Sequence, residues 1–154
     1  MARSGEEIEN PVAGMKLRFV QTAAETGGEL LEMEATYEPS SSPPIPHFHP
    51  RQREHFEILE GTMKARIGDD DVRELSAGDS LDIEASTVHS MWNNGPERAR
   101  TRWETRPALR TEDFFEQTSA VFRQAHEQGT EPDGARLAQI VEEFSDEFRV
   151  GSPG

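Results

Sequence analysis

The sequence predicts an all-β sandwich or barrel followed by two α-helices. Between Met15 and Arg106, short candidate strands are separated by Gly, Pro and Asp turns at close, regular spacing, which is typical of an antiparallel β-domain. After Pro107 the apolar residues recur at the period of a helix. A chain of 154 residues has the length of one domain with a single core.

The strand predictions rest mainly on alternation of apolar and polar residues. In the clearest run, Glu29–Glu38, Leu31 and Met33 begin an apolar face, and glutamates and a threonine occupy the other. Residues 1–14 are polar and are expected to form an N-terminal arm ahead of a β-barrel over residues 15–106. The other expected strands are Leu17–Thr22, Ile45–His49, Arg53–Glu60, Thr62–Ile67, Val72–Leu75, Ser80–Ile83, Val88–Asn93 and Arg98–Thr105.

Residues 107–150 are expected to form a helical pair that packs on the barrel or on a partner subunit. Thr111 is a candidate N-cap of the first helix, and Gly129 is expected to end it. A second helix is expected to start in the run Glu131-Pro132-Asp133-Gly134. The predicted buried stripes are Phe115, Thr118, Val121, Phe122 and Ala125 on the first helix and Leu137, Ile140, Val141, Phe144 and Phe148 on the second.

Composition excludes several classes of function. The chain has 30 Asp+Glu against 16 Lys+Arg, and its net charge of −14 disfavours non-specific binding to nucleic acid or an anionic membrane, because contact with phosphates needs a basic face. It has no cysteine, which excludes disulfides, thiolate metal ligands and a thiol nucleophile. The longest uncharged run, Pro39 to Pro50, has 12 residues and is too short to span a bilayer. The first residues lack the apolar stretch of a secretory signal, so a cytoplasmic location is expected.

Three histidines and one glutamate form a candidate metal site. His47 and His49 are two residues apart in an extended segment, so both side chains point to the same side of a strand. Glu54 opens the next expected strand, and His89 lies in a later one. Three neutral imidazoles and one carboxylate suit Fe(II), Mn, Ni, Cu or Zn and leave one or two positions for water, substrate or dioxygen. A single anionic ligand leaves such a site with a net charge of +1, which favours an anionic or enolised substrate.

The spacing of these residues resembles that of the cupin family. The first cupin motif is matched by His47, His49, Glu54 and, after six intervening residues, Gly61. The second motif is matched in register by Gly78, His89 and Asn93, after a short inter-motif stretch over residues 62–77. The sequence departs from the pattern at Ser41, where the family has glycine, and at Glu84-Ala85-Ser86, where the family has a Pro-x-Gly turn.

The resemblance covers residues 15–106 and implies a double-stranded β-helix, or jelly-roll barrel, with one divalent transition metal inside its mouth. It implies that His47, His49, Glu54 and His89 are the metal ligands. It also favours a homodimer, because cupins often pair their barrels, and the two amphipathic helices favour the same assembly. Family membership does not fix an activity, because cupins include dioxygenases, isomerases, decarboxylases, storage proteins and effector-binding modules.

A substrate pocket is expected next to the metal ligands, on the strand faces to which the ligand side chains point. Its candidate residues, most of which are expected to be barrel core, are Phe56, Ile58, Met63, Met91, Asn93 and Trp103. Outside the ligand set no general base stands out, so any acid–base step falls to Glu54 or to metal-bound hydroxide.

These residues favour a non-haem metalloenzyme, most plausibly a dioxygenase acting on a small enolisable or aromatic compound. Two other classes stay open: a metal-anchored module that binds a small molecule without turnover, and a metal-dependent isomerase or lyase. Turnover in the absence of oxygen would select the isomerase or lyase over the dioxygenase.

Overall fold

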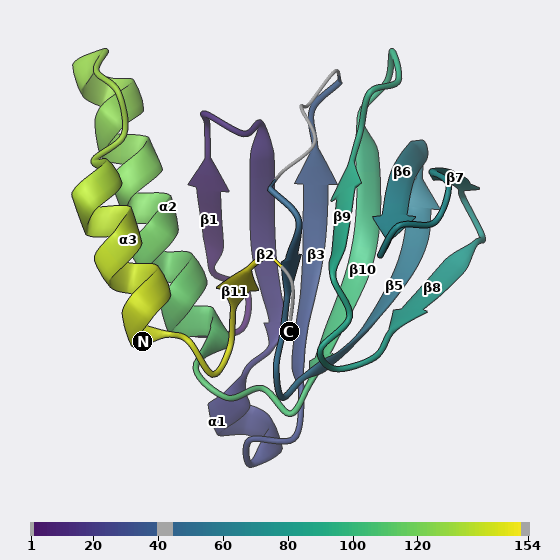
Figure 1. Ribbon diagram of the computed structural model, residues 1–154, viewed down its shortest axis with the longest axis horizontal. Helices are drawn as coiled ribbons and strands as arrows, with labels where there is room; N and C mark the ends of the chain where they lie inside the picture. The colour runs from purple at the N-terminus through teal and green to yellow at the C-terminus, as the bar shows by residue number, and fades with distance from the viewer. Residues whose placement is uncertain (1, 40–44, 152–154) are drawn as a thin grey trace.

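Two antiparallel β-sheets packed face to face form the body of the protein (Figure 1). The computed structural model describes residues 2–39 and 45–151. Within them the chain forms short strands up to Arg106 and then two long helices, which confirms the predicted all-β domain with a C-terminal helical pair.

The larger sheet has the strand order β1-β2-β3-β10-β5-β8. Its central strand β3 alternates strictly, so that Leu31, Met33 and Ala35 are fully buried while the residues between them face outward. Strands β2 and β10 flank β3 along its whole length. The strands of this sheet are β1 (Glu7–Asn10), β2 (Met15–Gln21), β3 (Leu31–Tyr37), β5 (Arg53–Glu60), β8 (Ser80–Ile83) and β10 (Ala99–Arg106).

The smaller sheet has the order β11-β4-β9-β6-β7 and covers the apolar face of the larger one. Its two shortest strands, β4 and β11, pair with each other through His47 and Phe48. Strand β4 also pairs with β9 at a single position, where His47 stands opposite His89. The strands of this sheet are β4 (His47–Phe48), β6 (Thr62–Ile67), β7 (Arg73–Ser76), β9 (His89–Trp92) and β11 (Arg149–Val150).

Helices α2 (Thr111–Gln128) and α3 (Gly134–Glu143) lie side by side next to the β1 edge of the larger sheet (Figure 1). Gly129 ends α2 in the left-handed conformation, as predicted, and Asp133 caps α3 by accepting a hydrogen bond from the backbone N–H of Arg136. A one-turn helix, α1 (Ala23–Thr26), lies between β2 and β3. None of the helices in the described part of the chain is long and apolar enough to cross a membrane.

Two expectations about the helices are corrected. Thr111 is not the N-cap of α2: Arg110 holds that position, and the Thr111 hydroxyl accepts a hydrogen bond from Gln52 Nε2 instead. The second helix does not extend to Phe148, because it ends at Glu143 and the chain turns before entering β11. Neither β1, which lies inside the segment expected to be an arm, nor β11 is among the strands that alternation predicts.

The apolar side chains form two clusters. The main core fills the space between the sheets, with Phe19, Leu31 and Met33 at zero exposure. A second, smaller cluster joins the helices through Phe114, Ile140 and Phe144. The space between these two clusters is a cavity, which adjoins the candidate metal site.

Candidate metal centre

The smaller sheet brings three histidines together. Pairing of β4 with β9 sets His47 opposite His89, and His49 follows β4 two residues after His47. One nitrogen atom from each of the three rings lies within 4.8 Å of the others, so His47, His49 and His89 could bind one metal ion. His49 and His89 are buried, and His47 is partly open to the cavity.

Each of these imidazoles is held in the same way. Their Nδ1 atoms lie 3.1, 2.7 and 2.8 Å from the backbone carbonyl oxygens of Ile45, Glu147 and Thr87 respectively. A carbonyl oxygen only accepts, so Nδ1 carries the hydrogen in all three rings. The Nε2 lone pairs are therefore free to coordinate, which is the tautomer that metal-binding histidines adopt.

Glu54 approaches the same point from the opposite sheet. Its Oε1 atom is 3.0 Å from His49 Nε2 and 3.0 Å from His89 Nε2, although it is not aligned for a hydrogen bond with either ring. Its Oε2 atom accepts a hydrogen bond of 2.7 Å from Trp103 Nε1. Trp103 reaches it because β10 pairs with β5 and puts Thr105 opposite Glu54, so that Trp103 is its diagonal neighbour on the same face.

The charges at this point depend on burial and on mutual contact. Burial alone would raise the pKa of Glu54, but the His49 and His89 rings, whose Nε2 atoms lie 3.0 Å from Oε1, stabilise the carboxylate and hold that pKa below its usual range. Burial would lower the pKa of His49, and the Glu54 carboxylate and the Glu147 carbonyl more than offset this and raise it. Burial, followed by repulsion from His89 and His49, lowers the pKa of His47 to about 4. The site is therefore an anion surrounded by imidazoles in a region shielded from water.

These residues fit a divalent transition metal. His49 Nε2 and Glu54 Oε1 are buried and have no hydrogen-bond partner within the described residues, although they lie 3.0 Å apart. Buried polar atoms without a partner are rare, and a shared cation is one arrangement that satisfies both. Three neutral nitrogens and one carboxylate oxygen form a donor set that suits Fe, Mn, Ni, Cu or Zn.

The C-terminal segment completes the surroundings of the histidines. The Glu147 carbonyl orients His49, and the Phe148 ring stacks on His47 with the centroids 4.8 Å apart. Sequence reasoning did not find either role. Glu147 is 98 residues from His49, and nothing in the local pattern indicates which carbonyl an imidazole will meet.

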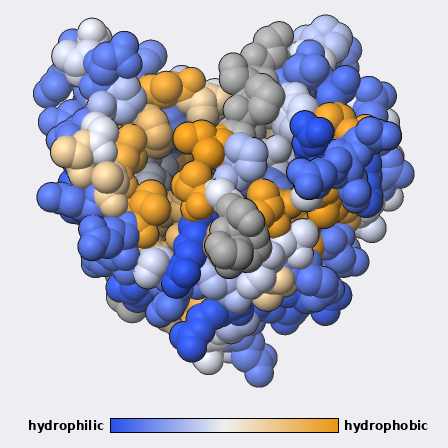
Figure 2. Space-filling model, in the orientation of Figure 1, coloured by the Kyte–Doolittle hydropathy of each residue, from blue (hydrophilic) through white to orange (hydrophobic). Residues whose placement is uncertain are grey.

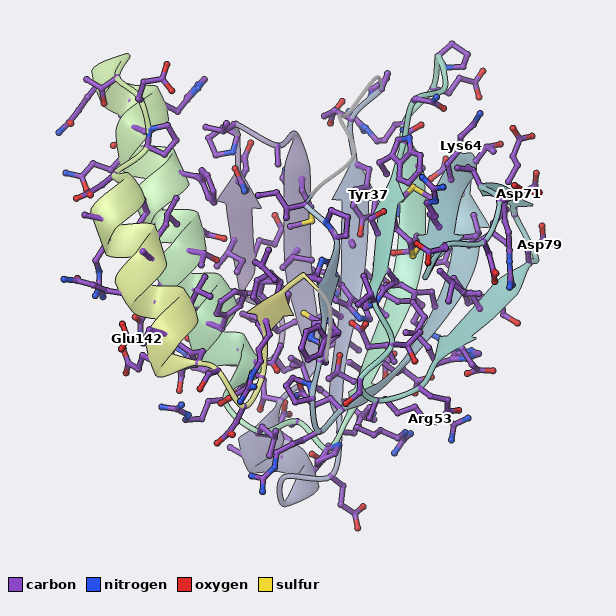
Figure 3. The ribbon with its side chains drawn as sticks, in the orientation of Figure 1. Tyr37, Arg53, Lys64, Asp71, Asp79 and Glu142 are labelled. Carbon is purple, nitrogen blue, oxygen red and sulfur yellow. The ribbon has the colours of Figure 1, made fainter. Side chains whose placement is uncertain are left out.

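A cavity of about 410 Å³ opens from the histidines towards the two helices. Apolar residues gather on the surface in this region, over the hollow between the helices and the sheets (Figure 2). Charged side chains such as Arg53, Asp79 and Glu142 lie at the periphery of the molecule, whereas Tyr37 on β3 belongs to the cavity wall (Figure 3). Tyr37 was not among the expected pocket residues.

The expected pocket residues fall into three groups. Phe56, Met91 and Trp103 line the cavity. Ile58 and Met63 lie in the core between the sheets and do not line it. The Asn93 side chain also does not line it, because its Nδ2 donates to backbone carbonyls that include that of Glu97, and so ties down the loop after β9.

Comparisons with known proteins agree with this fold. The family model of the cupin domain matches residues 33–103 of this chain. No curated protein matches it.

Solved structures resemble the chain in fold at low sequence identity. An RmlC-like cupin from Shewanella frigidimarina is 22% identical, with a TM-score of 0.56 over 70% of this chain and 86% of its own. An uncharacterised protein with a double-stranded β-helix domain from Klebsiella pneumoniae is 20% identical, with a TM-score of 0.53 over 71% of this chain and 84% of its own. The polyketide cyclase RemF from Streptomyces resistomycificus is 19% identical, with a TM-score of 0.54 over 62% of this chain and 66% of its own. These likenesses confirm the double-stranded β-helix.

Proposed function

The chain contains a cupin domain, which residues 33–103 form, and from this premise we propose that it is a metal-dependent enzyme of the dioxygenase type. Its substrate is a small enolisable or aromatic compound. The observation that carries the proposal is the common orientation of His47, His49 and His89, each of which keeps Nδ1 on a backbone carbonyl and leaves Nε2 for one shared ion. A divalent transition metal bound there supplies Lewis acidity and a partner for dioxygen.

Protein side chains supply the remaining requirements of such a site. The three imidazoles are neutral donors, so that Glu54 is the only anion among the four groups and the loaded site keeps a positive charge that attracts an enolate oxygen. Glu54 does not line the cavity: its Oε1 atom faces His49 and His89, and Trp103 holds Oε2 in place, so Glu54 would accept the proton of an enol or phenol only after leaving the metal. The apolar cavity wall excludes water, which strengthens these electrostatic interactions.

A second candidate is a metal-anchored module that binds its ligand without turnover. It is favoured by the cavity wall, where the described lining residues include no carboxylate, lysine or arginine that could serve an acid–base step beside the ligand. A non-oxidative isomerase or lyase is a further outcome, and the fold likeness to a polyketide cyclase makes cyclisation one reaction to include in the assay.

Oxygen uptake tests the proposal. Protein loaded with Fe(II), Mn(II) or Ni(II) is mixed with a flavonol or a β-diketone in an oxygen electrode, beside the His89→Ala variant in the same buffer. We expect oxygen consumption that needs the metal and that is lost in the variant. Conversion of substrate at the same rate under strict anaerobiosis would replace the dioxygenase by an isomerase or lyase. Metal-dependent binding with no conversion would replace it by the binding module.

A further inference from the structure

The cavity is built by two separate parts of the chain. Strands of the double-stranded β-helix contribute the histidines and rings such as Phe56 and Trp103, while α2, α3 and β11 contribute the opposite wall. The wall contributed by the helices lies outside the matched cupin domain, which ends at residue 103. The identity of the ligand therefore depends on side chains that the family pattern does not describe.

The residues that line the cavity disfavour a charged ligand. Among the described residues that line the cavity there is no Lys, Arg, Asp or Glu, and the polar side chains outside the histidines are few. One of them, Thr118, already donates its hydroxyl hydrogen to the Phe114 carbonyl. A phosphate or carboxylate buried here would have no counter-charge, and a sugar would leave most of its hydroxyls without partners, which is costly.

Two of the apolar side chains that line the cavity lie outside both core clusters. Phe122 on α2 and Leu137 on α3 line the cavity but belong neither to the core between the sheets nor to the cluster that joins the helices. Their neighbours Phe114 and Ile140 are the ones that hold the helices together. Apolar side chains that face a cavity and lie outside the buried clusters are suited to contact a ligand.

The geometry points to a ligand class: an uncharged, planar molecule of two or three fused rings that carries its metal-binding oxygen at one end. We infer that the oxygen meets the histidines while the rings lie between the barrel and the α2–α3 pair. This rests on the proposed metal site and narrows its substrate class. A cavity of 410 Å³ lies in the range that holds a drug-sized molecule. Its aromatic neighbours, for example the stacked pair Phe114 and Phe148 with centroids 4.8 Å apart, offer flat surfaces to a ring system.

The test compares ligands that share a metal-binding group and differ in the size and charge of their ring system. Protein loaded with Zn²⁺, which is redox-inert, is titrated without oxygen with 2′-hydroxyacetophenone, 1-hydroxyanthraquinone and the 6-sulfonate of the latter, and Kd is read by calorimetry. We expect 1-hydroxyanthraquinone to bind about tenfold or more tightly than either of the others, because it buries two further rings without charge. Equal affinity for all three would overturn the inference.

A matched pair of variants on α3 tests whether the ring system of the ligand lies against the helices. Leu137→Arg is expected to remove the tenfold preference while the Zn²⁺ content stays unchanged. Ala138→Arg, at the exposed neighbouring position on α3, is the control and is expected to keep the preference. A Leu137→Arg variant that keeps the preference would overturn the inference. So would one that turns a dimer into a monomer, because the wall would then be an interface between two copies.

The result separates this inference from the proposed function. Selective binding without oxygen uptake in the Fe(II), Mn(II) or Ni(II) forms would overturn the dioxygenase and leave the ligand class standing. Oxygen uptake with no preference among the three ligands would overturn the ligand class alone.

Discussion

Glu54 depends on a single indole for its position. It is 1% exposed, and Trp103 Nε1 is the hydrogen-bond donor to its Oε2 atom. The other oxygen is thereby turned towards His49 and His89. Groups that orient metal ligands in this way commonly change metal affinity by about 10- to 100-fold when they are removed.

Replacing Trp103 by phenylalanine is therefore expected to weaken metal binding about tenfold or more while the fold is kept. The hydrogen bond to Glu54 is lost, and the carboxylate gains freedom to turn away from the histidines. Calorimetric titration with Zn²⁺ measures the change. Trp92→Phe is the matched control, since Trp92 is 9% exposed against 8% for Trp103 and lies on β9. Equal loss of affinity in both variants would assign the effect to packing instead of ligand orientation.

At this scale the sequence predicts which residues meet and does not predict how they are held. The two-residue spacing of His47 and His49 follows from strand geometry, and both rings do lie at the common point. The carbonyl partners of the Nδ1 atoms are fixed by loops and by the C-terminal segment, whose placement depends on the whole fold.

Among the elements, the turn between β5 and β6, which carries the chain from the larger sheet to the smaller one, shows how one residue fixes a close approach. Gly61 joins the two strands with φ +76°, and a Cβ at this position would lie 2.5 Å from the Arg98 carbonyl oxygen and 3.0 Å from Ala99 Cα. Strand β6, after this turn, pairs with β9 in the smaller sheet, and strand β5, before it, carries Glu54. The tight approach of the turn to β10 needs a residue without a side chain.

Gly61→Ala is expected to lower the free energy of unfolding by about 3 kcal/mol, since it combines left-handed backbone strain with a clash against backbone. Gly78→Ala is the control: φ is +96° there, but nothing lies within 4 Å of the added Cβ, so we expect a loss of about 1 kcal/mol. Urea denaturation of the two variants measures both values. A loss at Gly61 no larger than that at Gly78 would contradict the close approach.

Strands with strong local patterns are predicted with their observed bounds, as for Arg53–Glu60, Thr62–Ile67 and Ser80–Ile83. Strand β1 has four residues, and β11 has only two, which is too short for any periodic signal. Strand β11 forms by pairing with β4, where Arg149 stands opposite Phe48 and Val150 opposite His47, and pairing over so long a sequence separation leaves no trace in the local sequence.

For the whole molecule, the sequence predicts the acidic surface and the barrel but does not predict the cavity. Glu54, Glu112 and Glu147 are buried. On the outer face of the larger sheet arginine pairs with glutamate, as in Arg102 with Glu57 at 2.8 Å. The family resemblance predicts the barrel. It does not predict the cavity, because that space depends on where α2 and α3 come to rest against the sheets.

The assembly stays a prediction. We expect a homodimer, as the resemblance implies, although the apolar residues of α2 and α3 pack largely against each other or line the cavity. Sedimentation equilibrium at micromolar protein is expected to give twice the chain mass of 17.3 kDa. A single species at the chain mass would contradict the dimer and would leave the metal site unaffected.

The proposed metal centre requires that His47, His49 and His89 converge on one ion, with Glu54 at their side. Elemental analysis of the purified protein beside the His89→Ala variant tests this directly, with circular dichroism to confirm that both are folded. We predict one divalent transition metal per chain in the natural protein and a loss of most of it in the variant. Equal metal content in both proteins, or none in either after incubation with Fe, Mn, Ni, Cu and Zn, would contradict the account.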